Sequence, residues 1–219
     1  MATEISSIAL FTTAAALAAT VVMLPPGIAL AWVLARQQFR GKAVVETVAS
    51  LPLVMPPVAT GLLLLWLLGR RGPIGRLLEP LGIEVVFTPA AVVVAMAIMG
   101  LPLLVRTARA GFEQVTRRYE QMAETLGAKP WRVFTTVTLP LARRNILAGA
   151  LLGFTRALGE FGATIVVAGS IPGRTRTLAV GIYTYTETGQ DARAAALLVI
   201  SVALAFGAVL VANRLAHVD

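Results

Sequence analysis

Few side chains in this sequence are of the kinds that perform covalent or acid–base chemistry. There is no cysteine, and the single histidine, His217, stands two residues from the C-terminus, which excludes thiolate sites and a Ser-His-Asp triad. The phosphate-loop pattern G-x-x-x-x-G-K-[S/T] is also absent, because the glycine-rich stretch from Gly69 to Arg76 does not end in Lys-Ser or Lys-Thr. We therefore expect no enzymatic activity, no ATP hydrolysis and no bound cofactor or metal.

One pair of opposite charges stands inside an apolar stretch. Arg156 and Glu160 are four residues apart, so they share one face of a helix and can form an ion pair. If this helix crosses a membrane, pairing offsets much of the roughly 2.5–3.5 kcal/mol that a lone charge costs at its centre. The pair can serve a pore or gate, or it can be a structural link between helices. The sequence supports both interpretations equally.

The elements that position this pair are predicted to be transmembrane helices. Hydrophobic residues make up 57% of the 219 residues and charged residues only 14%, against about 25% charged in soluble proteins, and the mean hydropathy is +0.80. A helix that crosses a bilayer needs about 20 mainly apolar residues. Five stretches qualify, so we expect an all-α polytopic membrane protein with about five transmembrane helices, forming one domain over residues 1–219. The predicted spans cover residues 8–35, 48–68, 88–105, 146–168 and 194–212.

The first of these stretches is interpreted as an uncleaved span rather than as a secretion signal. No basic residue precedes it, since Glu4 is the only early charge, and its apolar run is longer than the core of a signal peptide.

The distribution of basic residues predicts the orientation of the chain. One set of connections carries twelve Lys and Arg residues, and the other set carries six. Cytoplasmic segments are enriched in these residues, so we expect the first set inside, with the N-terminus outside and the C-terminus inside. This topology accounts for the net charge of +8 without nucleic acid as a partner. The twelve are Arg36, Arg40, Lys42, Arg106, Arg109, Arg117, Arg118, Lys129, Arg132, Arg143, Arg144 and Arg214, and the six are Arg70, Arg71, Arg76, Arg174, Arg176 and Arg193.

The longest connection, residues 107–145, falls on the predicted cytoplasmic side. Its apolar residues recur at three- and four-residue steps, which is typical of a helix. Gly127 is expected to end this helix, and Lys129-Pro130 to begin another. A folded loop of this length in so small a membrane protein suggests a docking surface for another protein. The alternative is an amphipathic helix that lies on the lipid surface.

The segment Gln121-Met122-Ala123-Glu124-Thr125-Leu126-Gly127, with Val137-Thr138-Leu139-Pro140 after it, resembles the EAA loop of importer-type ABC permeases. The glycine, the Leu-Pro and the second alanine match, whereas Gln121 stands where Glu is usual, Met122 replaces the first alanine, and Val137 replaces Ile. The resemblance implies that a short coupling helix, around residues 123–132, docks into a groove of a separate ATPase. The implied docking residues are Glu120, Gln121, Met122, Ala123, Glu124, Gly127, Ala128, Lys129, Pro130 and Arg132.

Four further segments resemble permeases for molybdate, tungstate and sulfate: residues 34–42, 51–58, 156–164 and 171–178. The short length is most similar to the molybdate permeases. The resemblance implies import of molybdate by alternating access across the bacterial inner membrane. The implied partners are a dimeric ABC ATPase, a periplasmic or lipoprotein solute-binding protein and a second copy of this chain. Tungstate and sulfate or thiosulfate stay open as substrates, as does pairing with a different permease chain.

The second and fourth spans are expected to line the pathway. Pro52, Pro56 and Pro57 should distort the second span and free backbone carbonyls, and broken helices are tolerated where they line a cavity. Ordinary kinks in a packed bundle are the alternative. Glu160 is not expected to bind substrate, because a carboxylate repels a dianion. The candidate pore or gate residues are Pro56, Pro57, Thr60, Arg156, Glu160 and Thr164.

An outer loop carries Arg174 and Arg176 just after Pro172-Gly173. These two side chains are expected to contact the binding protein or to steer the oxyanion. A merely solvated loop is the alternative.

Two other classes of function stay open. A secondary transporter driven by ion gradients often carries an inverted repeat, and five spans do not divide into equal halves. A membrane enzyme needs polar residues clustered at one depth, and the predicted spans offer only Arg156 and Glu160.

Overall fold

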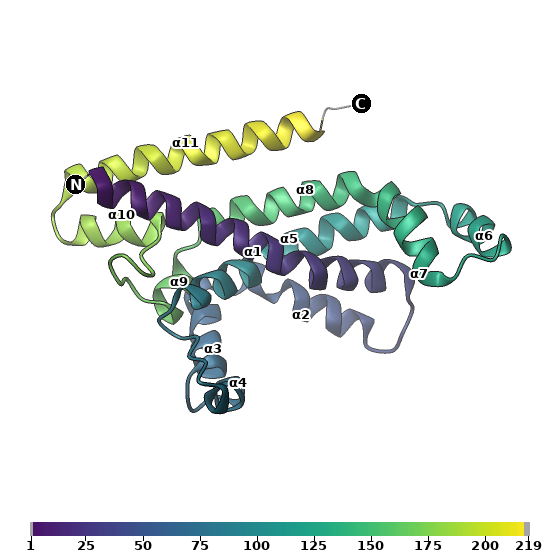
Figure 1. The fold of residues 1–219 in the computed structure, drawn as a ribbon, viewed down its shortest axis with the longest axis horizontal. Helices are drawn as coiled ribbons and strands as arrows, with labels where there is room; N and C mark the ends of the chain where they lie inside the picture. The colour runs from purple at the N-terminus through teal and green to yellow at the C-terminus, as the bar shows by residue number, and fades with distance from the viewer. Residues whose placement is uncertain (1, 217–219) are drawn as a thin grey trace.

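The computed structural model describes residues 2–216, which form an all-helical bundle (Figure 1). Its long helices are α1 (Ala2–Arg36), α5 (Pro89–Gln114), α8 (Leu139–Leu158) and α11 (Asp191–Ala216). α5 packs against both α1 and α8, and α11 lies along α8 and α1. The predicted all-helical class is confirmed, and His217 lies outside the described residues.

Shorter helices connect the long ones. Between α1 and α5 lie α2 (Lys42–Val54), α3 (Pro57–Leu68), α4 (Pro73–Leu78) and the 3-10 turn η1 (Glu79–Leu81). Between α5 and α8 lie α6 (Arg117–Thr125), α7 (Pro130–Val133) and the π-helical segment η2 (Phe134–Thr138). Between α8 and α11 lie α9 (Gly162–Val167) and α10 (Leu178–Glu187).

Among the described residues, three helices are long and apolar enough to cross a membrane: Thr3–Arg36, Pro89–Gln114 and Asp191–Leu210. They correspond to the predicted first, third and fifth spans. The predicted second span, residues 48–68, is a pair of helical segments, Lys42–Val54 and Pro57–Leu81, with a bend of 115° between them. If this pair counts as one span, the number of candidate spans rises to four. The bend falls at Pro56 and Pro57 because neither proline has an N–H to continue the helix.

The predicted fourth span, residues 146–168, is not one continuous helix. α8 begins earlier, at Leu139, and it ends at Leu158; the chain then breaks before α9 begins at Gly162. With Arg143, Arg144 and Arg156 in its sequence, α8 is not among the helices apolar enough to count as a span. The composition of the described residues therefore gives three or four candidate spans where the sequence analysis expected about five.

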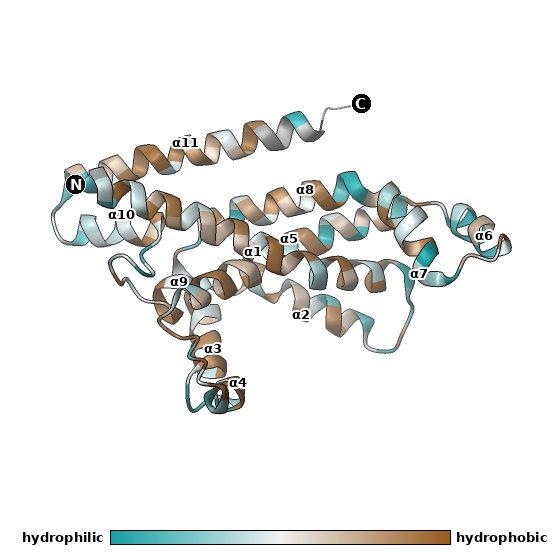
Figure 2. Cartoon of the chain, viewed as in Figure 1, coloured by the Kyte–Doolittle hydropathy of each residue, from teal (hydrophilic) through white to brown (hydrophobic). Residues whose placement is uncertain are grey.

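The connection between α5 and α8 is also shorter than the predicted residues 107–145. α5 continues to Gln114, and α8 already starts at Leu139, so the connection covers residues 115–138. It forms one end of the bundle, opposite the end that holds the N-terminus and α10 (Figure 1). Figure 2 shows hydrophobic residues along α1, α3, α5 and α11, and hydrophilic residues at α6 and at the start of α8.

α5 and α8 approach each other closely at Gly100 and Gly153. A Cβ atom at Gly100 would lie 2.8 Å from the backbone oxygen of Gly153, whereas a Cβ atom at Gly153 would meet the flexible end of Met23. Small residues at helix interfaces let the backbones approach each other, which is the main source of packing energy between helices in lipid.

We expect Gly100→Ala to lower the free energy of unfolding by about 1–3 kcal/mol, because the backbone of α8 cannot move aside cheaply. Gly153→Ala should cost less, since the Met23 side chain can change its rotamer. Thermal unfolding in detergent measures both. Gly207→Ala is the control, because a Cβ atom there meets nothing within 4 Å. Equal losses at Gly100 and Gly153 would contradict this account of the interface.

Candidate functional site

The helix pair α6–α7 contains the loop that the sequence analysis predicted to dock an ATPase. α6 ends in a Schellman turn, in which the N–H of Gly127 donates to the Glu124 carbonyl (2.9 Å) and the N–H of Ala128 to the Ala123 carbonyl (3.0 Å). Gly127 has φ +85, in the left-handed region that favours glycine. Lys129 is extended, as a residue before proline should be, and Pro130 starts α7. The turn therefore explains the glycine at position 127.

This helix pair exposes large apolar side chains at its tip. Leu126 is 88% exposed and Trp131 is 73% exposed, and Tyr119 and Met122 are each more than half exposed. A shallow apolar cavity of about 480 Å³ lies between α6 and the start of α8. It is lined by Tyr119, Met122, Ala123, Leu126, Thr136, Val137, Pro140 and Leu141. Of the predicted docking residues, Gln121, Met122, Glu124, Gly127, Lys129, Pro130 and Arg132 are exposed, and Ala123 and Ala128 are half-buried.

Glu120 differs from the other predicted docking residues because it points into the protein. Its side chain is 17% exposed and pairs with Arg36 at the end of α1, with 3.0 Å between Nη2 and Oε1. The same Oε1 atom accepts a 2.6 Å hydrogen bond from Thr138 in η2. Sequence reasoning missed both partners, because Arg36 was counted only as a topology signal and Thr138 only as one letter of a motif.

The candidate gate residues Arg156 and Glu160 form the predicted ion pair, with 2.7 Å between Nη1 and Oε2. Glu160 is 1% exposed, and its Oε1 atom also accepts a 2.7 Å hydrogen bond from the N–H of Ala163 in the first turn of α9. The carboxylate therefore joins the end of α8 to the start of α9 across the break. Thr164 is also buried, and its hydroxyl donates a hydrogen bond to the backbone oxygen of Phe161 (2.8 Å).

The two broken helices, α2–α3 and α8–α9, meet at their breaks. A Cβ atom at Gly162 would lie 2.7 Å from Cβ of Pro57, and one at Gly61 would lie 2.8 Å from the Ala163 oxygen. α3 and α9 are thus packed backbone to backbone. Thr60 is buried between them, and its hydroxyl has no hydrogen-bond partner among the described residues. Pro56 and Pro57 are exposed at the bend.

The two outer-loop arginines differ in their surroundings. Arg174 is exposed. The side chain of Arg176 is 11% exposed; its Nε donates to Ser170 (3.1 Å), and its guanidinium lies 5.4 Å from the ring of Tyr185. Tyr185 in turn donates to Glu4 of α1 (2.7 Å). This geometry gives Arg176 a structural role that links α10 to the N-terminal turn of α1, and it leaves Arg174 as the better candidate for contact with another protein.

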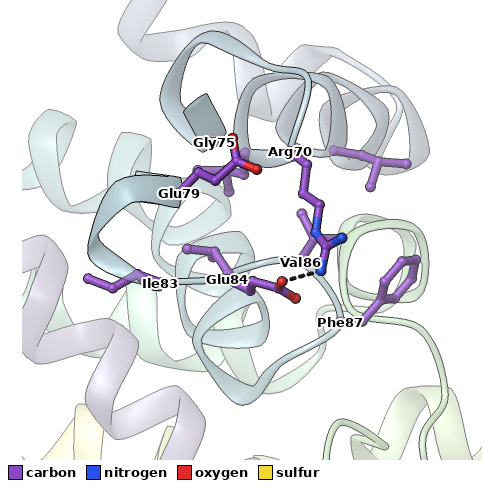
Figure 3. Close-up of a pocket in the computed structure, with 12 residues that line it drawn as sticks. Arg70, Gly75, Glu79, Ile83, Glu84, Val86 and Phe87 are labelled. Carbon is purple, nitrogen blue, oxygen red and sulfur yellow. Dashed lines mark hydrogen bonds and ion pairs between the residues drawn. The ribbon is translucent and has the colours of Figure 1, made fainter. Parts of the chain in front are cut away.

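A cavity of about 640 Å³ lies beside the end of α3 and involves none of the predicted site residues. Arg70 and Glu84 form an ion pair at this cavity (Figure 3). Phe87, which also lines it, has φ +60, and its N–H donates to Val167 at the end of α9 (3.0 Å). The sequence carries no signal for this cavity, because α4 and η1 were not predicted.

The sequence matches a family model described as binding-protein-dependent transport system inner membrane component, over residues 27–217. A relative from Escherichia coli K12, "Molybdenum transport system permease protein ModB", is 48% identical over 90% of this chain and 86% of its own length. A relative of the same name from Mycobacterium tuberculosis is 44% identical over 87% of this chain and 72% of its own. "Sulfate transport system permease protein CysW" from Synechocystis is 42% identical over 70% of this chain and 56% of its own.

Solved structures share the fold at low sequence identity. A chain of the inward-facing MetNI methionine ABC transporter has a TM-score of 0.67 at 16% identity, covering 99% of this chain and 94% of that one. A chain of a bacterial ABC transporter for alginate import has a TM-score of 0.69 at 18% identity, covering 97% and 79%. The family match over most of the sequence, with this shared fold, shows that the chain belongs to the binding-protein-dependent transport system inner membrane components.

Proposed function

We propose that this chain is the membrane subunit of an ATP-driven importer that moves molybdate across the bacterial inner membrane by alternating access. The observation that carries the proposal is the 48% identity, over 90% of the chain, to a relative named for molybdenum transport. Relatives at 39–44% identity in other bacteria carry the same kind of name. The subunit itself is not an enzyme, and a separate dimeric ABC ATPase hydrolyses the ATP.

The ATPase docks on the α6–α7 pair. Two features support this site: an exposed apolar tip around Leu126 and Trp131, and a rigid turn at Gly127 that fixes the shape of the tip. In this position the ATPase pushes on α7, which continues through η2 into α8 without a break in the helix. Movement at the tip therefore reaches the Arg156–Glu160 pair along one continuous element.

The α6–α7 end is cytoplasmic, with the N-terminus outside and the C-terminus inside. The positive-inside rule supports this orientation, since the connections at the α6–α7 end hold most of the Lys and Arg residues. The α10 end then faces outward, where a periplasmic or lipoprotein binding protein delivers its anion. Arg174, exposed in the loop before α10, contacts that protein.

The pathway runs between this chain and a second copy of it, along the breaks of α2–α3 and α8–α9. The carbonyls of Pro52 and Leu53 lose their helical partners because residues four positions on are prolines. Lipid offers no donor to such groups, whereas a water-filled pathway does. The Arg156–Glu160 pair acts there as part of the gate.

Sulfate transport is the second candidate, because one relative named for sulfate is 42% identical over 70% of the chain. Proteoliposomes that hold this chain and its ATPase, with ATP inside and anion-loaded binding protein outside, separate the two. We expect ATP-dependent uptake of labelled molybdate that excess tungstate suppresses and that excess sulfate leaves unchanged. Uptake of sulfate in preference would assign the second candidate. Uptake without ATP would point to an ion-driven transporter instead.

We expect Gly127→Val to abolish ATP-dependent uptake, because a β-branched residue at φ +85 is strained by about 1–3 kcal/mol and reshapes the docking turn. The same change at Gly189, which has φ +69 near the opposite end of the bundle, is the matched control. It carries similar strain and should leave the ATPase bound and uptake near that of the wild type. Co-purification of the ATPase measures docking, and equal loss of docking in both variants would contradict this site.

For the gate, we expect Glu160→Gln to raise the ATP-independent leak of molybdate from loaded liposomes. Gln still accepts from the N–H of Ala163, but it no longer pairs with the Arg156 charge. Glu160→Ala also loses this acceptor, and it should lower the free energy of unfolding by about 3 kcal/mol, the low end for a buried pair, since Arg156 is partly exposed. A lower thermal stability of Glu160→Gln without any leak would identify the pair as a structural link only.

A further inference from the structure

The ion pair of Glu120 and Arg36 is the point at which four elements at the α6 end meet. The Oε1 atom of Glu120 receives hydrogen bonds from Arg36 of α1 and from Thr138 of η2. The same Nη2 atom of Arg36 also donates to the backbone oxygen of Val115 at the end of α5 (2.9 Å). Arg117 of α6 donates to the backbone oxygen of Arg36 (3.3 Å). α1, α5, α6 and η2 are therefore tied together through one oxygen atom and one guanidinium.

Aromatic side chains pack around part of this polar junction, and a cavity of about 250 Å³ borders it. Phe134, the first residue of η2, has its ring centroid 5.6 Å from that of Trp32 in α1 and 6.2 Å from that of Phe112 in α5. Trp131 of α7 approaches the same ring at 5.7 Å. The side chain of Arg36 is 10% exposed, and Thr138 is 1% exposed. Charge-assisted hydrogen bonds among largely buried groups are stronger than exposed ones.

η2, which connects α7 to α8, is a π-helix, whereas α7 and α8 are α-helices. Its five residues form a π-helix, and single π turns inside α-helices are less regular and occur often at functional sites. Thr138 is its last residue, so the hydrogen bond to Glu120 fixes α6 to the point where η2 becomes α8. If this bond were lost, α6 would be held only by its other contacts with η2 and α7 and by the Arg36 bonds, and its angle to α8 would be less well defined.

We propose that Glu120 is a positioning residue for energy coupling: it clamps α6 to α1 and to the η2–α8 junction, so that a push on the α6–α7 tip moves α8 instead of bending the tip. The inference rests on the proposed function and adds a role to it. According to this proposal, Glu120 does not contact the ATPase, whereas its exposed neighbours Gln121 and Glu124 do. The clamp fixes the angle between α6 and α8 but is not part of the exposed tip. Its loss therefore uncouples ATP hydrolysis from transport without preventing the ATPase from docking.

The test uses the reconstituted complex with its ATPase and molybdate-loaded binding protein, and it measures molybdate taken up per ATP hydrolysed. Thr138→Val replaces the hydroxyl with a methyl group and keeps the shape of the buried side chain. We expect it to lower the transport-to-hydrolysis ratio by about fivefold or more, the range of a typical coupling free energy between sites. Glu120→Ala should lower the ratio further, and Glu120→Gln, which still accepts both hydrogen bonds, should recover part of it.

Thr135→Val is the matched control for Thr138→Val, because the Thr135 hydroxyl bonds only to carbonyls of its own helix, those of Trp131 and Arg132. Glu113→Ala is the control for charge removal, since Glu113 pairs with Arg109 on the surface of α5. Both should keep the wild-type ratio. In the double variant of Glu120→Ala and Thr138→Val, the second change should add nothing, because the two residues share one interaction.

Two results would overturn the inference. Either the transport-to-hydrolysis ratio of Thr138→Val and Glu120→Gln equals that of the wild type, or transport and hydrolysis fall in parallel, as expected of a residue that only supports folding or docking. Failure of the proposed function has a different signature. In that case the wild-type complex itself shows no ATP-dependent uptake of molybdate, whatever the variants do.

Discussion

Inside a lipid bilayer the polypeptide backbone must find all its hydrogen-bond partners within the protein, and this constraint explains most of the structure. The long helix α11 satisfies it by itself, and α1 and α5 do so except where their internal prolines, Pro25, Pro26 and Pro102, supply no N–H. Their polar side chains follow the same rule: the hydroxyls of Thr12, Thr13 and Thr20 in α1 donate to carbonyls four residues earlier. Where the backbone departs from the α-helix, another group takes over. The carboxylate of Glu160 accepts a hydrogen bond from the N–H of Ala163 at the α8–α9 break. The hydroxyl of Thr12 accepts one from the N–H of Leu178 at the start of α10.

Lipid does not drive helices together as water does, so the bundle depends on close contact. The buried face of α1 is built from small residues, including Ala15, Ala16 and Ala19. The packing of α3 on α9 depends on Gly61 and Gly162, each of which touches the backbone or a proline of the other segment. Many large apolar side chains also face outward, as on α11, where Phe206 and Val199 are more than half exposed. In a soluble protein such a surface would cause aggregation, whereas here it meets acyl chains.

The sequence predicts the helical class, the uninterrupted spans and the turn at Gly127, because each of these depends on local composition or on one residue's backbone preference. It also predicts the Arg156–Glu160 pair, since a spacing of four places both on one helix face. It fails where the outcome depends on contacts between distant segments. Glu120 reaches Arg36, which is 84 positions away in the sequence, and Tyr185 reaches Glu4, which is 181 positions away. No periodicity reveals such partners. The break after Leu158 was missed for a related reason, because the apolar run continues through it while the hydrogen bonds do not.

The composition of α8 has a consequence for how the protein is made. With Arg143, Arg144 and Arg156, this helix is more polar than α1, α5 and α11, and it packs along α5 and α1. During synthesis α1 and α5 leave the ribosome first, and both are apolar enough to insert alone. They then offer α8 a protein surface in place of lipid, with Gly100 and the Met23 side chain ready to receive Gly153. The order of the helices along the chain places α8 after α1 and α5, so we expect the most polar of the long helices to insert after the two helices that it packs against.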